Sequence, residues 1–284
     1  MSAPGASRRS RFALAGRSPV LDLRVDAARA DLADVRLADR VFAPHYAAPM
    51  PCTAGRRVPV MASSGDPQEQ ALSEVLAGEP FEVLEVTSSH HWGISPIDGA
   101  VGYVPRDAFV PAFPTSHLVA VARAPLRAGV TGDAATLDLL PMGTRLAAVR
   151  AASAAMEVDG GFVAEAALLP LADAGGEPAD FAERLLGVAY RAGGRSGAGV
   201  DAAGLVFLCH MMAGREVPRF ADLQAGIGHA IGGGEVRRGD LLCVDDGVAI
   251  ASDPAFAIRV RQGGIVERVE IAALGSTITA RRFA

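Results

Sequence analysis

Apolar and polar residues alternate over short distances in the first two thirds of the chain, and Gly and Pro interrupt the alternation every few residues. One order of short strands occurs twice in succession. Gly102-Tyr103-Val104 closes the first copy and Gly161-Phe162-Val163 closes the second, each before a short segment that favours one helical turn. Short alternating segments between Gly and Pro turns predict small β-barrels. We therefore expect one barrel at residues 56–113 and another at 117–173.

The last third of the chain changes to a helical period and then returns to strands. Residues 173–178 have the composition of a linker, and 179–188 predict a helix capped by the acidic turn before it. A second helix is expected at 202–213, because Leu205, Leu208, Cys209 and Met212 fall on one face. Four strands of an antiparallel sheet should follow, at residues 240–244, 248–252, 255–260 and 265–270. Residues 177–284 are thus expected to form one α+β domain of ordinary size.

Residues 1–55 precede the repeats and carry no regular pattern of their own. Pro44, Pro49 and Pro51 prevent a long helix here, because proline cannot continue the helical hydrogen bonding. We expect a tail, one short helix, and an extended arm that lies across the other modules.

Composition excludes several classes of function. The net charge of −5 gives no electrostatic reason to expect nucleic acid as a partner. No apolar run approaches the length of a membrane span, and the N-terminal sequence lacks the apolar core of a signal peptide, so a cytoplasmic location is expected. Cys52, Cys209 and Cys243 do not have the spacing of metal ligands, and we expect no metal or other cofactor.

The most informative segment is Gly187–Val206, GVAYRAGGRSGAGVDAAGLV, in which a Gly-rich loop leads into the second helix. A cysteine at the start of such a helix has a lowered pKa, because the free N–H groups and the helix dipole stabilise its thiolate. Ala202 occupies that position, and its methyl group can neither attack nor exchange a proton. The segment therefore predicts a loop and helix built to present a nucleophile, without the nucleophile.

This segment resembles the signature of the NlpC-type (NlpC/P60) cell-wall cysteine peptidases. The residues that carry the resemblance are Tyr190, Gly193-Gly194, Gly199, Asp201 and Gly204-Leu205-Val206, and farther on Val217-Pro218-Arg219, Gln224 and Arg238–Leu241. The two repeats resemble bacterial SH3-like domains in the order of their parts. The resemblance implies two SH3-like barrels followed by a papain-like NlpC-type domain. It also implies an ancestral activity of cutting peptidoglycan stem peptides as a γ-D-glutamyl-diamino acid endopeptidase.

The resemblance places three catalytic positions on residues that cannot perform the chemistry. The nucleophile position falls on Ala202, the general base on Gly247, and the orienting polar residue on Phe256; a slip of one residue would put Asp246 at the base position. The resemblance thus implies a catalytically inactive relative that binds a muropeptide, another peptide or a protein partner. Phe256 is also a candidate to plug the groove above Ala202.

Five residues are candidates for ligand binding: Asp201, Tyr190, Trp92, Tyr103 and Arg219. Asp201 either binds the free amine of a peptide, as the resemblance implies, or only caps the following helix. Trp92 and Tyr103 either form an aromatic wall facing the third domain or, in the case of Trp92, pack within the first barrel. Arg219, like Arg195, either pairs with a ligand carboxylate or is an ordinary surface arginine.

Three alternatives remain to be tested. Cys209 and His210 do not form a displaced catalytic pair, because adjacent helical residues point about 100° apart and Cys209 lies about 10 Å along the axis from Ala202. A residual hydrolase would have to use His229, Asp246 or a bound metal. The third alternative is a structural scaffold, either as a homodimer or bound to an active paralogue.

Overall fold

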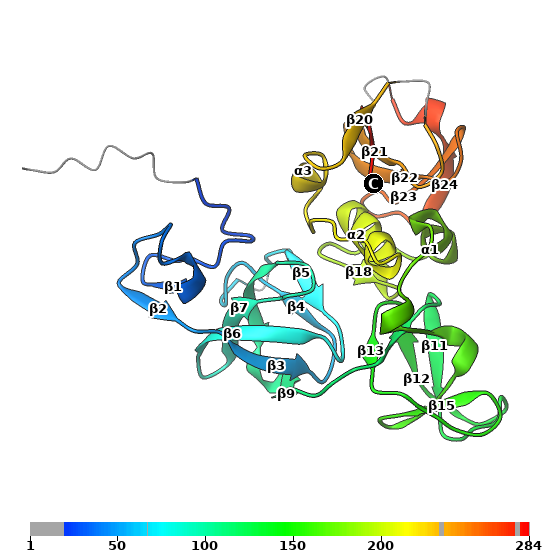
Figure 1. Ribbon diagram of the computed structural model, residues 1–284, viewed down its shortest axis with the longest axis horizontal. Helices are drawn as coiled ribbons and strands as arrows, with labels where there is room; N and C mark the ends of the chain where they lie inside the picture. The colour runs from blue at the N-terminus through cyan, green and yellow to red at the C-terminus, as the bar shows by residue number, and fades with distance from the viewer. Residues whose placement is uncertain (1–19, 67, 233–235, 276–278, 284) are drawn as a thin grey trace, which may run out of the picture.

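The computed structural model describes residues 20–66, 68–232, 236–275 and 279–283 (Figure 1). An N-terminal arm is followed by a first module of residues 50–111, a second module of residues 117–173 and a C-terminal third module. Most of the described elements are strands and only a few are helices, so the chain has less helix than the expected α+β class implies. None of the described helices is both long and apolar enough to cross a membrane.

The arm contains β1 (Leu32–Asp34) and β2 (His45–Ala47), which pair in parallel, and a single 3₁₀ turn at Val35–Leu37 in place of the expected short helix. Its backbone binds the first module, since Val101 N–H donates to the carbonyl of Arg24 over 2.8 Å. The part of the predicted tail before residue 20 lies outside the described residues.

The first module is built on a five-stranded sheet in the order β8-β7-β6-β3-β9, with a separate pair β4-β5. The strands are β3 (Met50–Ala54), β4 (Val58–Val60), β5 (Ser73–Val75), β6 (Pro80–Val86), β7 (His90–Ile94), β8 (Val101–Pro105) and β9 (Phe109–Pro111). Strand β3 begins before residue 56, so the expected boundary is too late. The sheets pack around a core that includes Val58, Val75 and Phe81, but the described strands do not close into a barrel.

The second module repeats this plan with two sheets, in the orders β12-β11-β16-β15-β14 and β13-β10-β17. Its strands are β10 (His117–Val119), β11 (Arg123–Arg127), β12 (Thr136–Pro141), β13 (Arg145–Leu146), β14 (Val149–Arg150), β15 (Ala155–Val158), β16 (Gly161–Ala164) and β17 (Leu168–Pro170). In both modules the Gly-aromatic-Val strand leads into one 3₁₀ turn, as the repeat predicted. Here, too, the described strands form open sheets.

The third module places α1 (Pro178–Arg184) and α2 (Ala202–Met212) against a six-stranded antiparallel sheet (Figure 1). The sheet order is β20-β25-β21-β22-β23-β24, with β20 (His229–Ile231), β21 (Leu241–Val244), β22 (Gly247–Ala251), β23 (Phe256–Arg259), β24 (Glu267–Glu270) and β25 (Thr279–Arg282). A hairpin β18-β19 (Arg195–Ser196, Gly199–Val200) precedes α2, and the short α3 (Ala221–Gln224) follows it. The core lies between α2 and the sheet, where Leu205 and Leu208 pack with Ile250 and Ile258.

The sequence pattern located α2 and the four consecutive strands β21 to β24 correctly. It did not predict the short strands β20 and β25 at the other edge of the sheet. It also made α1 too long, and the cap was wrong, because the Glu177 side chain makes no capping hydrogen bond.

Candidate functional site

The amino end of α2 is shaped by the Gly-rich loop before it. Asp201 caps the helix, with Oδ1 accepting a 2.6 Å hydrogen bond from the Gly204 N–H. Gly204 lies so close to the loop that a Cβ there would be 2.0 Å from the carbonyl oxygen of Gly194. Only glycine allows this approach, and it brings the loop directly beside Ala202, the first residue of the helix.

All the acceptor capacity of Asp201 is used within the protein. Besides Gly204, its carboxylate accepts from Gly193 N–H over 3.0 Å and from Arg219 Nη1 and Nη2 over 3.0 and 2.7 Å. A carboxylate has about four lone-pair positions, so these four donors leave none for a ligand amine. The structure therefore supports the capping role that the sequence left open.

Arg219 is not a surface residue. It is 1% exposed, it forms the two-pronged ion pair with Asp201, and its Nε donates to the Ser73 hydroxyl of the first module over 3.1 Å. Arg195 is likewise fully buried. The reading of these two arginines as ordinary surface residues is therefore wrong, because both are held by carboxylates inside the molecule. Arg219 also lines the groove over Ala202, so a contact with a ligand stays a prediction for it.

Ala202 and Gly247 face each other across the site. A Cβ placed on Gly247, at the start of β22, would lie 3.3 Å from the Cβ of Ala202. The two positions that the sequence assigned to nucleophile and base are thus adjacent in space, although they carry a methyl group and a hydrogen. Gly247 has φ of +139°, a backbone conformation that residues with a side chain rarely adopt.

Phe256 lies elsewhere, which corrects two expectations. Because Ala257 pairs with Ala251, Phe256 lies at the far end of the β22–β23 hairpin from Gly247. Its ring instead lies under the Arg268 guanidinium, 4.4 Å from the ring centroid. Phe256 therefore neither occupies the orienting position nor plugs the space above Ala202, where Val260 and Gln262 reach the site instead.

A groove of about 510 Å³ opens over Ala202, and we call this space the groove. All parts of the chain but the second module contribute to its lining: Arg24 from the arm, Leu72 from the first module, and Tyr190, Asp201, Ala202, Ala203, Arg219, Phe220, Ala221, Asp222, Asp246, Val260 and Gln262 from the third. Arg24 binds Asp222 through both of its Nη atoms, at 3.1 and 2.6 Å. Asp246 is 52% exposed, and its nearest cation, Arg259 Nη1, is 3.5 Å away.

Of the predicted aromatic residues, only Tyr190 lines the groove. Burial and the nearby Asp201 carboxylate raise the pKa of its hydroxyl. Trp92 is 3% exposed and lies beneath the Arg29 guanidinium of the arm, and Tyr103 accepts a hydrogen bond from the same arginine. The two therefore form a binding surface for the arm and not a wall of the groove.

Cys209 and His210 are both core residues, and the helical pattern predicted this for Cys209 only. Burial raises the pKa of the Cys209 thiol and lowers that of His210 to about 4. The His210 Nδ1 hydrogen-bonds to the carbonyl of Val206, and the ring packs edge-on against Phe283. Neither side chain lines the groove.

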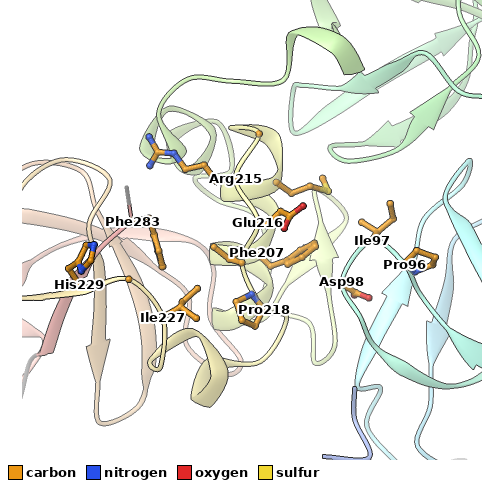
Figure 2. A pocket seen from close by; sticks show the side chains of 14 residues that line it. Pro96, Ile97, Asp98, Phe207, Arg215, Glu216, Pro218, Ile227, His229 and Phe283 are labelled. Carbon is orange, nitrogen blue, oxygen red and sulfur yellow. The ribbon is translucent and has the colours of Figure 1, made fainter. Parts of the chain in front are cut away.

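His229 lines a second, larger cavity of about 1020 Å³ (Figure 2). This cavity lies between Pro96–Asp98 of the first module and the third module, where Phe207 and Met211 of α2 form part of its wall. Figure 2 shows Phe207 pointing toward Asp98 across the boundary between the two modules. No group of three or more His, Cys, Asp or Glu side chains in the described parts of the chain could hold a metal ion.

Comparison with known proteins identifies two parts of the chain. Residues 187–257 match the model of the NlpC/P60 family, and residues 61–109 match that of the bacterial dipeptidyl-peptidase SH3 domain. The chain therefore contains an NlpC/P60 domain preceded by a bacterial SH3-like domain, which confirms the resemblance for the third module and for the first repeat. The SH3-like identity of the second repeat stays a prediction. No curated protein matches the chain.

Two solved structures agree with this chain at the level of the fold. An NlpC/P60 family protein from Bacillus cereus superimposes with a TM-score of 0.70 at 16% identity, covering 82% of this chain and 99% of that one. A novel NlpC/P60 endopeptidase from Photobacterium damselae gives 0.52 at 12% identity, covering 78% and 66%. RipD from Mycobacterium tuberculosis, described as a non-catalytic protein adapted to peptidoglycan binding, is 24% identical over 30% of this chain and 68% of its own, with a TM-score of 0.28.

Proposed function

We propose that this protein is a non-catalytic relative of the NlpC/P60 peptidases that binds a short peptide in the groove. The observation that carries the proposal is the 3.3 Å approach between the Ala202 methyl group and the Cβ position of Gly247. A cysteine peptidase needs a thiolate and an imidazole at two such facing positions. Removing the reacting groups of a catalytic triad costs several orders of magnitude in rate and leaves only binding effects.

The charges in the groove favour a ligand with a free amino group. Asp201 is saturated by protein donors, and Asp222 is held by Arg24. Asp246 is the groove carboxylate with the weakest internal pairing, and it is half exposed. A charge-assisted hydrogen bond from an ammonium group to Asp246 would fix the amino end of a peptide beside Tyr190. L-Ala-γ-D-Glu-meso-diaminopimelate, the peptide that the family resemblance implies, has such an end.

Calorimetric titration with this tripeptide tests the proposal, with mass spectrometry of the same samples to detect cleavage. We expect binding at one site per chain and no products. Asp246→Asn should weaken binding by about tenfold to 150-fold, because a charged hydrogen bond contributes about 1.5–3 kcal/mol. Asp245→Asn is the matched control, since Asp245 is an exposed neighbour outside the groove lining and its loss should leave affinity unchanged.

Three results would contradict the proposal. If no binding is detected at millimolar tripeptide, the proposed ligand is wrong. If the tripeptide is cleaved and Cys209→Ala abolishes the cleavage, the protein is an enzyme and the proposed absence of catalysis is wrong. Binding weakened equally by Asp245→Asn and Asp246→Asn would show a general charge effect and not the groove contact.

A scaffold function is the second candidate, favoured by one edge of the second module. Strand β12 is an edge strand, and it exposes Leu137 and Leu139, at 56% and 47%. An exposed apolar edge strand can pair with a strand of another chain. Light scattering of the purified protein would detect a dimer, and Leu139→Lys should dissociate it if β12 forms the contact.

A further inference from the structure

A buried network of charged groups joins the first module to the third. Arg195 of β18 donates to both carboxylate oxygens of Glu79, over 2.9 and 2.5 Å, and its Nε lies 2.8 Å from Oδ2 of Asp98. Its backbone N–H donates to Glu74 over 2.7 Å. All four side chains are fully buried at the boundary between the modules. Burial alone would raise the pKa of Asp98, but Arg195 and a hydrogen bond from Ser73 lower it.

The network continues from the first module into the groove through one hydroxyl group. The Ser73 Oγ donates to Asp98 over 2.5 Å and accepts from Arg219 Nε over 3.1 Å. Arg219 in turn holds Asp201 with both Nη atoms, and Asp201 caps α2 beside Ala202. Ser73 thus links the buried anion Asp98 to Arg219, the cation that balances Asp201.

We propose that the first module positions the floor of the groove through Ser73, whose hydroxyl keeps Arg219 on Asp201 and so sets the charge at the amino end of α2. Ser73 is a positioning residue, since it acts on the groove only through Arg219. The inference rests on the proposed function in one respect, namely that a ligand binds over Ala202. The groove itself does not depend on that ligand.

The physical reason lies in the competition of two carboxylates for one guanidinium. The Ser73 hydroxyl separates Arg219 from Asp98 and satisfies both. Without it, Asp98 loses a donor and Arg219 Nε loses its acceptor inside a region of low dielectric, where unpaired polar groups are costly. Arg219 should then shift toward Asp98 and leave the charge of Asp201 less balanced.

The movement of Arg219 can be measured in the variant Ala202→Cys, through the pKa of the introduced thiol. The introduced thiol lies at the helix start, where N–H groups favour the thiolate and the charge of Asp201 disfavours it. Asp222, Asp246, Tyr190, Arg24 and Arg219 also line the groove around it. The pH dependence of its alkylation by iodoacetamide, followed by mass spectrometry of the peptide that carries residue 202, gives the thiol pKa with no ligand present.

Adding Ser73→Ala should raise that thiol pKa and slow alkylation at pH 7 about threefold to tenfold, since each pKa unit changes the thiolate fraction about tenfold. Glu79→Gln is the matched control at the same boundary, because it disturbs Arg195 without touching Ser73 or Arg219. It should lower the melting temperature at least as much as Ser73→Ala and leave the thiol pKa unchanged.

Ser73→Thr and Ser73→Val give a second comparison if Ser73→Ala does not fold. These two side chains have the same shape, and only threonine keeps the hydroxyl. Threonine should retain the original alkylation profile and valine should slow it. An unchanged thiol pKa without the hydroxyl, or an equal change with Glu79→Gln, would overturn the inference. Because no peptide is used, a failure here is distinct from a failure of peptide binding.

Discussion

The first and second modules share a plan of strands, yet they join the third module through opposite chemistry. The first joint is ionic: Arg195 is enclosed by Glu74, Glu79 and Asp98, and all four side chains are fully buried. The second joint is apolar: Leu118, Ala120 and Met142 belong to the same core cluster as α1 and α2. Polar contacts across it are few, such as those from Arg123 and Arg184 to backbone carbonyls.

The difference indicates a division of roles between the joints. An apolar core stabilises without fixing direction, because hydrophobic burial depends on area and not on angle. A buried ion cluster contributes less net stability, but each of its groups must meet a particular partner. Two residues at the ionic joint line the groove: Leu72, and Arg219, which donates a hydrogen bond to Ser73. No residue of the second module lines it. The ionic joint is thus the one that lies next to the proposed binding site.

The largest expected effect is that of removing the central cation. Arg195→Met keeps much of the side-chain volume but leaves Glu79 and Asp98 buried without their partner. Breaking a buried ion pair on one side costs about 3–5 kcal/mol, so the free energy of unfolding in urea should fall by that amount. The surface pair Arg150–Glu165 is the control, since Arg150 is 74% exposed and Arg150→Ala should cost less than about 1 kcal/mol. Equal losses in the two variants would refute the distinction.

Shortening the central side chain of the apolar joint should lower the free energy of unfolding slightly less than Arg195→Met does. Met142 is fully buried, and Met142→Ala removes contacts with α2 and leaves a cavity. We expect a loss of about 3 kcal/mol in the free energy of unfolding. Met142→Leu should recover most of the loss; if it does not, the joint depends on the shape of methionine and not on buried area.

This contrast also marks the limit of what the sequence could predict. Local signals were sufficient for α2, for the strands β21 to β24 and for Asp201 as a cap, because periodicity and capping involve neighbours in the chain. Glu79 and Ser73, the first-module partners of Arg195 and Arg219, lie 116 and 146 residues away, so the sequence left both arginines as candidates for the surface. Phe256 was misplaced for a related reason: strand register depends on the turn at 252–255, which the family pattern does not fix.

The third and smaller expected effect is a pH dependence of the free energy of unfolding that comes from the buried His210. His210 has a pKa of about 4 in the folded protein because burial disfavours its charged form, against about 6.5 when unfolded. The unfolded state therefore binds more protons between these values, and stability is lost as pH falls from 6.5 toward 4. The free energy of unfolding should drop by about 2 kcal/mol from pH 7 to pH 5, and His210→Gln should remove most of that drop. The exposed His45 is the control, and the same flattening in His45→Gln would assign the drop to some other group.

The smallest effect should come from the polar contacts of the second joint. Arg184 Nη1 donates to the carbonyl of Ala120 over 3.0 Å, and the residue is exposed. Water replaces such a bond easily when the donor is exposed, so Arg184→Ala should cost only about 0.5–1 kcal/mol in urea unfolding. Arg184→Gln, which retains a donor, should cost less. If Arg184→Ala lowers the free energy of unfolding nearly as much as Arg195→Met, the second joint also depends on charged side chains. The contrast between an ionic and an apolar joint would then be wrong.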